Sequence, residues 1–252
     1  WTGHPIAQSN WYAFGRLAWD HTLTAETIAD EWIRMTFSND QAVVSPLKEM
    51  MLASREITVQ YMTPIGLHHI MGYNHHYGPG PWIRDKPRED WTSVYYHKAD
   101  ENGIGFNRSS SGTNALEQYA PPVRTIYDKP ETCPEKFLLW FHHLPWDHKM
   151  SSGRTLWDEL CYAYHAGADS VAWMQQQWSS LKGKIDDDRF AQVESLLNIQ
   201  HKEAVWWRDA CLSYFQTFSK RPIPAGLEQP AHALEYYESL EFPFAPGIRP
   251  RW

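Results

Sequence analysis

The chain has 252 residues, with 23 basic and 30 acidic side chains and a formal net charge of −7. An acidic protein repels the phosphate backbone, so nucleic acid is not expected as a partner. No apolar run is long enough to cross a membrane. A content of 42% hydrophobic and 21% charged residues is typical of a globular protein, and it excludes a disordered chain or a coiled coil.

Most of the periodic sequence predicts α-helix, because apolar residues recur every three to four positions. Helix starts are indicated by Thr24, by Ser45-Pro46, by Thr155 and by the acidic run 186–188. Residues 91–97 alternate weakly and predict one short strand. In chain order, the predicted helices cover residues 9–20, 24–35, 45–63, 114–119, 132–141, 155–181, 186–218 and 231–240.

These elements predict a mainly α-helical fold over residues 1–252: a single multi-helix domain with at most a minor β element. Its long loops are rich in Gly, Pro, His and aromatic residues, and the longest covers residues 64–90. Loops of this length inside compact domains are usually functional. The three cysteines share no metal-ligand spacing and predict buried thiols with at most one disulfide.

Aromatic residues are unusually frequent: 14 Trp, 13 Tyr and 10 Phe make up 15% of the chain. Indole and phenol rings bury a flat apolar face and keep one polar group, which suits them both to cores and to stacking on sugars. Tryptophans at helical spacing are predicted to lie in the core or at an interface. Those fixed by prolines in the loops are predicted to contact a ligand.

The first candidate site is the segment 67–82, which has four histidines within nine residues. Adjacent histidines point in different directions and no Cys or Glu completes a ligand spacing, so a metal is not predicted. Core packing and a polar–aromatic ligand surface both remain open. On the second reading, glycines and prolines fix Trp82 as a stacking platform, accompanied by His75, His76 and Tyr77.

The second candidate site is the segment 141–150, which repeats this chemistry with paired histidines followed by a proline-fixed Trp146. Asp147 beside His148 could serve in acid–base catalysis or could cap local backbone amides. Asp158 and Glu159 are weaker candidates, since acidic residues in a first helical turn favour the helix dipole. The chain has no nucleophile elbow, phosphate loop or dinucleotide fingerprint, and no cofactor is predicted.

Six long and unusual strings are spread over most of the chain, at residues 10–20, 29–34, 61–82, 90–97, 138–143 and 152–160. In these strings the sequence resembles the C-terminal region of glycoside hydrolase family 67, the α-glucuronidases that remove 4-O-methyl-glucuronic acid from xylan fragments.

The resemblance implies a parent of three parts: an N-terminal domain, a central (β/α)8 barrel and this mostly helical C-terminal domain. In the family this last domain packs on the barrel, shapes the mouth of the active site and carries much of the homodimer contact. It also supplies a tryptophan to the region that holds xylose, and Trp82 matches that role.

The resemblance places the catalytic acid and base in the barrel, and no catalytic residue is carried over to this chain. Inverting glycosidases need two carboxylic groups ~6.5–9.5 Å apart, and none of the barrel motifs is found here. The chain begins at Trp1 without an initiator Met, which suggests a piece of a longer protein.

The leading hypothesis is therefore the C-terminal domain of an α-glucuronidase, with a xylan-derived oligosaccharide, a second copy and an upstream barrel as its partners. One alternative is a xylo-oligosaccharide-binding module that uses Trp82, Trp146 and the paired histidines. A second is a free-standing xylan-active hydrolase, and a third is a purely scaffolding and dimerising domain. The free-standing hydrolase would use local carboxylates, namely Asp90, Asp100, Asp147, Asp158 or Glu159.

Overall fold

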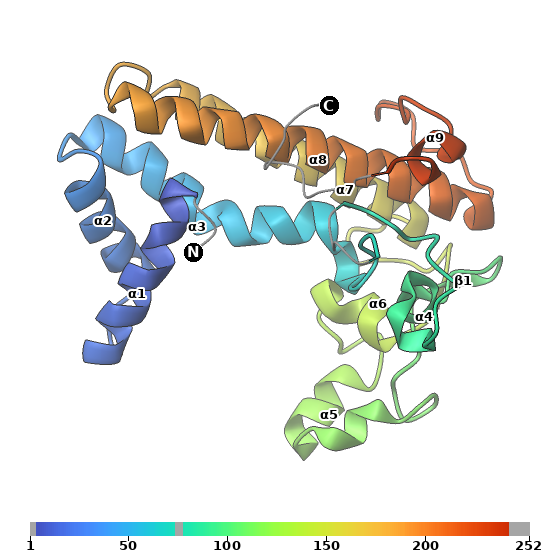
Figure 1. The fold of residues 1–252 in the computed structure, drawn as a ribbon. Helices are drawn as coiled ribbons and strands as arrows, with labels where there is room; N and C mark the ends of the chain where they lie inside the picture. The colour runs from blue at the N-terminus through green and yellow to red at the C-terminus, as the bar shows by residue number, and fades with distance from the viewer. Residues whose placement is uncertain (1–3, 74–77, 242–252) are drawn as a thin grey trace. The chain divides into compact units, whose positions relative to one another are not determined.

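The computed structural model describes residues 4–73 and 78–241, which are mainly α-helical as the sequence predicts (Figure 1). Three predicted ligand residues, His75, His76 and Tyr77, lie outside the described residues. Within the described part, no helix has both the length and the apolar character needed to cross a membrane.

Contacts divide the chain into two compact units. The first comprises Trp1–Thr58 and Asp169–Lys202, and the second comprises Val59–Ala168 and Glu203–Trp252. Each unit is described by itself, and the expectation of one domain over residues 1–252 stays a prediction. Three long helices have residues in both units: α3 (Gln41–Met62), α7 (Leu156–Ser179) and α8 (Asp187–Ser219).

The first unit begins with the short 3-10 helix η1 (Pro5–Ala7), α1 (Gln8–Trp19) and α2 (Ala25–Thr36). The Thr24 hydroxyl accepts the backbone N–H of Thr27 at 3.2 Å, which confirms the predicted cap of α2. Glu31 of α2 accepts hydrogen bonds from Tyr12 and Arg16, and these join α2 to α1. The fully buried side chains of this unit include Ile33, Val43, Val44, Val171, Trp178 and Val193.

The predicted start of α3 at Ser45-Pro46 is wrong, because the helix begins at Gln41 and Pro46 lies inside it. Asp40 provides the start instead. Its carboxylate accepts the N–H of Ala42 at 2.9 Å, and its carbonyl accepts the N–H of Val43 at 2.9 Å. Pro46 is the sixth residue of α3, beyond the first turn where proline is best tolerated, and it removes one backbone N–H from the helix.

The second unit contains mostly short elements between the ends of the long helices. Two strands, β1 (Gly103–Ile104) and β2 (Leu144–Pro145), pair antiparallel with Gly103 opposite Pro145 and Ile104 opposite Leu144. The helical elements are η2 (Pro64–Gly66), η3 (Glu89–Trp91), α4 (Ser93–His97), η4 (Ala115–Gln118), α5 (Pro121–Tyr127), η5 (Glu135–Phe137), α6 (Leu138–Phe141) and α9 (Leu234–Glu238).

The strand predicted at residues 91–97 is wrong, since this segment forms η3 and α4. The hydroxyl of Thr92 accepts the N–H of Tyr95 at 3.3 Å and caps α4. This local hydrogen bond favours a helix start more than the weak alternation of apolar and polar residues favours a strand. α5 was not predicted. It begins at Pro121, within a segment of low apolar periodicity.

The buried tryptophans confirm the core prediction for Trp32, Trp157, Trp178, Trp206 and Trp207. Trp157 also donates its indole N–H to the carbonyl of Pro222 at 2.8 Å, and this bond ties the C-terminal segment to α7. In contrast, Trp11 and Trp19 on α1 are 66% and 88% exposed. All three cysteines are buried free thiols, as predicted.

Candidate functional site

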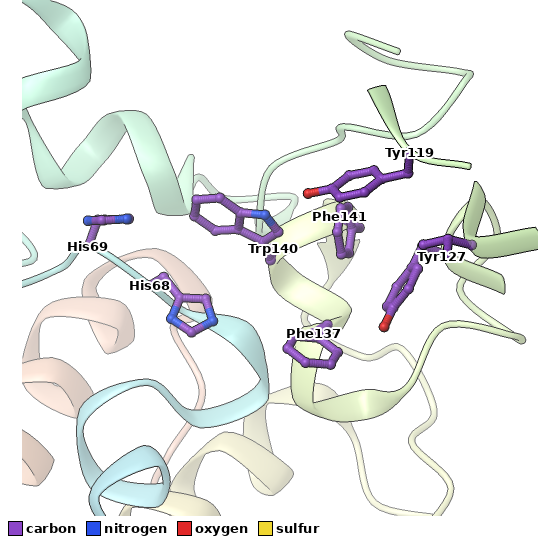
Figure 2. A pocket seen from close by; sticks show the side chains of 8 residues that line it. His68, His69, Tyr119, Tyr127, Phe137, Trp140 and Phe141 are labelled. Atoms are coloured by element: carbon purple, nitrogen blue, oxygen red, sulfur yellow. The ribbon is translucent and has the colours of Figure 1, made fainter. Parts of the chain in front are cut away.

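The two histidine-rich segments meet within the second unit, where η2 packs against η5 and α6. The ring of His68 lies edge-on to the indole of Trp140, with centroids 5.4 Å apart, and the ring of His69 lies 5.9 Å from the same indole (Figure 2). The sequence predicts both segments as candidate sites, but it does not predict that Trp140 joins them.

A cavity of about 340 Å³ opens at this junction (Figure 2). Rings form most of its wall, and the two histidines and two tyrosines add polar groups, a composition typical of small-molecule sites. It is lined by His68, His69, Tyr119, Val123, Tyr127, Phe137, Trp140 and Phe141. None of these lining residues is acidic.

A second cavity, of about 320 Å³, shares His69 with the first. It contains Asp90, whose carboxylate is held by Arg88 at 2.9 Å. It also contains Trp91, which is 46% exposed and carries the Arg88 guanidinium 5.3 Å from its ring centre. Its lining residues are His69, Met71, Gly72, Tyr73, Asp90, Trp91, Thr92, Ser93 and Tyr96.

The histidine pair lies on a strained stretch of backbone that its surroundings hold in place. Ile65 and His69 have left-handed backbone angles, with φ of 56° and 58°, and such residues persist only where the surrounding structure fixes them. Between them, Gly66 has a φ of +91°, and a Cβ there would lie 2.9 Å from the carbonyl carbon of Phe137. Close backbone packing of η2 on η5 therefore positions His68 and His69.

Arg108 lies behind the wall of the first cavity, against Trp140, and no motif marks it in the sequence. Its guanidinium carbon lies 3.8 Å from the ring centre of Trp140 and 4.1 Å from that of Phe106. The side chain also donates to the carbonyl of Trp140. Burial lowers the pKa of Arg108, and burial together with the positive charges of His69 and Arg108 lowers the pKa of His68.

His142 of the second candidate segment and His97 of α4 are packed in the interior. His97 is buried, with Nε2 2.9 Å from the carbonyl of Pro81 and Nδ1 accepting the N–H of Ala99 at 2.9 Å. Burial lowers the pKa of His97 to about 4, so the ring is neutral near pH 7. His142 is also buried, with Nε2 2.9 Å from the carbonyl of Tyr127.

Trp82 and Trp146, the two predicted sugar platforms, differ in exposure. Trp82 is half-buried, packs against Trp206 and Tyr237, and leaves part of its ring accessible. Trp146 is only 3% exposed, and its indole N–H donates to the carbonyl of Asp100 at 2.9 Å. The prediction that Trp146 offers a face to a ligand is therefore wrong in this structure, because both its ring and its polar group are already used.

Of the predicted acidic residues, Asp90 lines the second cavity, whereas Asp100, Asp147, Asp158 and Glu159 line neither cavity. Asp147 is exposed, with a carboxylate oxygen 3.8 Å from Arg221. Glu159 accepts a hydrogen bond from Arg154 at 3.0 Å. The backbone N–H of Asp158 donates to the hydroxyl of Thr155 at 3.1 Å in the first turn of α7. Within residues 4–73 and 78–241, no three His, Cys, Asp or Glu side chains gather as a metal site.

The structure therefore defines a mainly helical chain with two cavities lined largely by aromatic and histidine side chains. Comparison with known proteins identifies the family. The profile "Glycosyl hydrolase family 67 C-terminus" matches residues 2–228. The chain belongs to glycoside hydrolase family 67 and corresponds to its C-terminal domain.

Most of the chain also aligns with part of each of several curated proteins named α-glucuronidase. Alpha-glucuronidase A of Aspergillus tubingensis is 35% identical over 229 residues, which is 90% of this chain and 27% of that protein. Alpha-glucuronidase A of Emericella nidulans is 35% identical over 232 residues, 90% of this chain and 26% of that protein. The chain thus spans about a quarter of the length of these relatives.

Proposed function

We propose that this chain works as part of an α-glucuronidase that acts on oligosaccharides derived from glucuronoxylan, with the catalytic acid and base in an upstream barrel. The observation that carries the proposal is the match itself: 90% of the chain aligns with proteins named α-glucuronidase, yet covers only 27% of the first of them. The predicted carboxylates Asp147, Asp158 and Glu159 line neither cavity. Asp90 lines the second cavity, but it is paired with Arg88 and is the one acidic side chain among the lining residues, so a pair of catalytic carboxylic groups is not found there, which favours catalysis by residues outside this chain.

The domain's proposed contribution is to shape the mouth of the active site and to contact the oligosaccharide. The accessible part of Trp82 and the segment with His75, His76 and Tyr77 remain the proposed substrate contacts. Trp91 joins them on structural grounds, because it is 46% exposed at the edge of a cavity. A fixed, half-exposed indole stacks well on the apolar face of a pyranose ring.

Dimerisation is the second proposed role, and the surface that supports it lies on α1. Trp11, Phe14 and Trp19 are 66%, 70% and 88% exposed, and Met35 on α2 is 65% exposed. Exposed apolar clusters of this kind mark interaction sites in soluble proteins. A second copy of the chain would remove these side chains from water.

Activity measurements test the main proposal. The purified chain is incubated with aldouronic acids, and released 4-O-methyl-glucuronic acid is compared with that from a full-length family member. We expect no release by the chain alone. Release at a rate near that of the full-length enzyme would overturn the proposal and favour a free-standing hydrolase.

A xylo-oligosaccharide-binding module is the second candidate, favoured by the two cavities that the chain forms on its own. Calorimetry with xylo-oligosaccharides tests this candidate in the wild type, Trp82→Ala and Trp91→Ala. Binding by the inactive chain that is lost in either variant would support it. A lack of heat with every xylan fragment would leave only a shaping and dimerising role.

A further inference from the structure

His165 is buried in α7, and both nitrogens of its ring lie against carbonyl oxygens. The side chain is 7% exposed. Nδ1 lies 2.8 Å from the carbonyl oxygen of Cys161, one turn earlier in α7, and Nε2 lies 3.0 Å from the carbonyl oxygen of Glu228. A carbonyl oxygen accepts hydrogen bonds and cannot donate one. Each ring nitrogen therefore needs a proton to form a hydrogen bond with its neighbour.

A neutral imidazole has one N–H, so it can donate to only one of these two carbonyls. In either tautomer, the other nitrogen would turn a lone pair toward a carbonyl oxygen, and both atoms would lose a hydrogen bond inside the protein. The ring of His97 differs, because its Nε2 faces the carbonyl of Pro81 while its Nδ1 accepts the N–H of Ala99. That arrangement fits a neutral ring, whereas the arrangement at His165 fits an imidazolium.

The charged groups next to His165 come from α8 and from the segment that follows it. Glu228, whose carbonyl faces the ring, pairs its carboxylate with Arg208 at 2.8 Å, and Arg208 also pairs with Asp209 at 2.7 Å. Arg208 is thus one cation between two carboxylates. A protonated His165 makes the charges of this group balance, and the balance together with two hydrogen bonds offsets the cost of burying the imidazolium.

The titratable neighbours of His165 along α7 add no positive charge. Burial raises the pKa of the Cys161 thiol and of the Tyr164 hydroxyl well above their usual ranges, so both groups stay neutral. Tyr162 is half-buried, and Asp169, four positions further along the helix, is exposed. A carboxylate at this helical spacing favours a cation. The charges around the ring therefore favour its protonated form.

The carbonyl that Nε2 meets belongs to residues 220–233, which join α8 to α9 without helix or strand and are called the strap here. Near the start of the strap, the indole of Trp157 donates to the carbonyl of Pro222 at 2.8 Å. Further along, the ring of His165 meets the carbonyl of Glu228. Both donors come from α7, so two side chains of this helix hold the strap, and one of them can lose a proton.

We propose that His165 is a buried imidazolium that holds the strap to α7, and that the loss of its proton at raised pH releases the strap around Glu228. With one N–H left, the ring keeps its hydrogen bond to only one of the two carbonyls. Its stabilising contribution is therefore present at low pH and lost as the pH rises. The strap leads into α9, where Tyr237 packs with Trp206 and Trp82, so release also loosens the packing around Trp82.

Nuclear magnetic resonance of the 252-residue chain, labelled with ¹⁵N in its histidine rings, tests the charge directly. Both ring nitrogens of His165, assigned through bonds from its backbone amide, should be protonated at pH 7, where an exposed imidazole is mostly neutral. Hydrogen exchange of the Leu227 and Ala231 amides then follows the strap. Corrected for its intrinsic pH dependence, it should rise about tenfold between pH 7 and 9, because a hydrogen bond from a charged donor is lost.

The matched variants are His165→Gln and His21→Gln. Both are made in the Glu203→Gln background, because burial raises the pKa of Glu203 to about 7 and its titration would overlap. Glutamine at position 165 keeps a donor but has no proton to lose in this range, so the corrected exchange should not change with pH. His21 is exposed in the first unit, and its variant should keep the full tenfold rise. If His165→Gln does not fold, the ring signals of the wild type still decide the question.

A single protonated nitrogen on His165 at pH 7 would overturn the inference, because the ring would then be neutral. An equal rise of strap exchange with pH in His165→Gln and in His21→Gln would also overturn it, since another group would then release the strap. The inference uses only contacts of the chain itself and none of the measurements uses a carbohydrate. Neither result therefore bears on the activity test of the proposed function.

Discussion

The buried carboxylate of Asp209 accepts three hydrogen bonds from described residues of the second unit, and its removal gives a quantitative test of the structure. Asp209 is 2% exposed and accepts hydrogen bonds from Arg208 at 2.7 Å and from the N–H of Ala231 and the hydroxyl of Tyr237, both at 3.2 Å. These bonds fix the segment before α9. They also place Tyr237 beside Trp206 and Trp82.

Asp209→Ala should lower the free energy of unfolding by about 3–5 kcal/mol, since it leaves the Arg208 cation buried without its closest partner. Glu228 still reaches Arg208, but its side chain is 71% exposed and compensates little. The loss is a large fraction of the ~5–15 kcal/mol that stabilises a typical domain. The matched control Glu228→Gln should cost at most about 1 kcal/mol.

Urea unfolding, followed by circular dichroism and by tryptophan fluorescence, measures the stability of both variants. An unchanged slope of the transition shows that the substitution has not altered the denatured state. Burial, followed by the charge of Asp209, raises the pKa of Tyr237 to about 12. Spectrophotometric titration of Asp209→Asn should therefore show this pKa shifted downward. A loss below about 1 kcal/mol in Asp209→Ala, or an unchanged Tyr237 titration, would refute the described network.

Three further predictions follow from single positions. Burial raises the pKa of Glu203 from 4.5 to about 7, so its stabilising contribution is full below pH 4.5 and is lost as the pH rises through 7. Glu203→Gln should remove this pH-dependent loss of stability, which is about 3 kcal/mol between pH 4.5 and 8. Thermal melts of the wild type and the variant that change with pH in the same way would contradict the prediction. Gly66→Ala should destabilise the chain by about 1–3 kcal/mol more than Gly183→Ala. Both glycines have a positive φ, but only a Cβ at Gly66 meets backbone, so equal urea midpoints would argue against the close packing. Trp19→Glu should weaken self-association at least about tenfold in sedimentation without altering the melt, because a residue that is 88% exposed contributes little to the fold. Unchanged association would exclude this face of α1 from the dimer.

Helices whose signals are local could be predicted from the sequence. The caps at Thr24 and Thr155 form where the pattern places them, and α7 and α8 end within two residues of their predicted ends. Pro46 gave a wrong start for α3, because Asp40, six residues upstream, provides the cap and the helix continues through the proline.

The state of a loop tryptophan could not be predicted, because distant residues decide it. Trp82 and Trp146 have the same sequence context, because each directly follows a proline and each comes after a run that contains paired histidines. Trp146 is buried because the carbonyl of Asp100, 46 residues away, accepts its indole N–H and Trp157 packs edge-on at 6.0 Å. The sequence shows which rings are fixed but not which carbonyls they meet.

The candidate site illustrates the same limit at a larger scale. The pair His68-His69 is visible in the sequence, but the cavity also needs Trp140, which its helical position predicted to be core or interface. Arg108, which stacks on the Trp140 ring, has no motif. What brings them together is a strained turn around Gly66 held against the backbone of Phe137. Strain of this kind is stable only when the surrounding packing supplies the free energy, so the site and the stability of the η2–η5 contact are coupled. Substitutions that relieve the turn should therefore stabilise the backbone locally and displace His68 and His69 from the indole that they share.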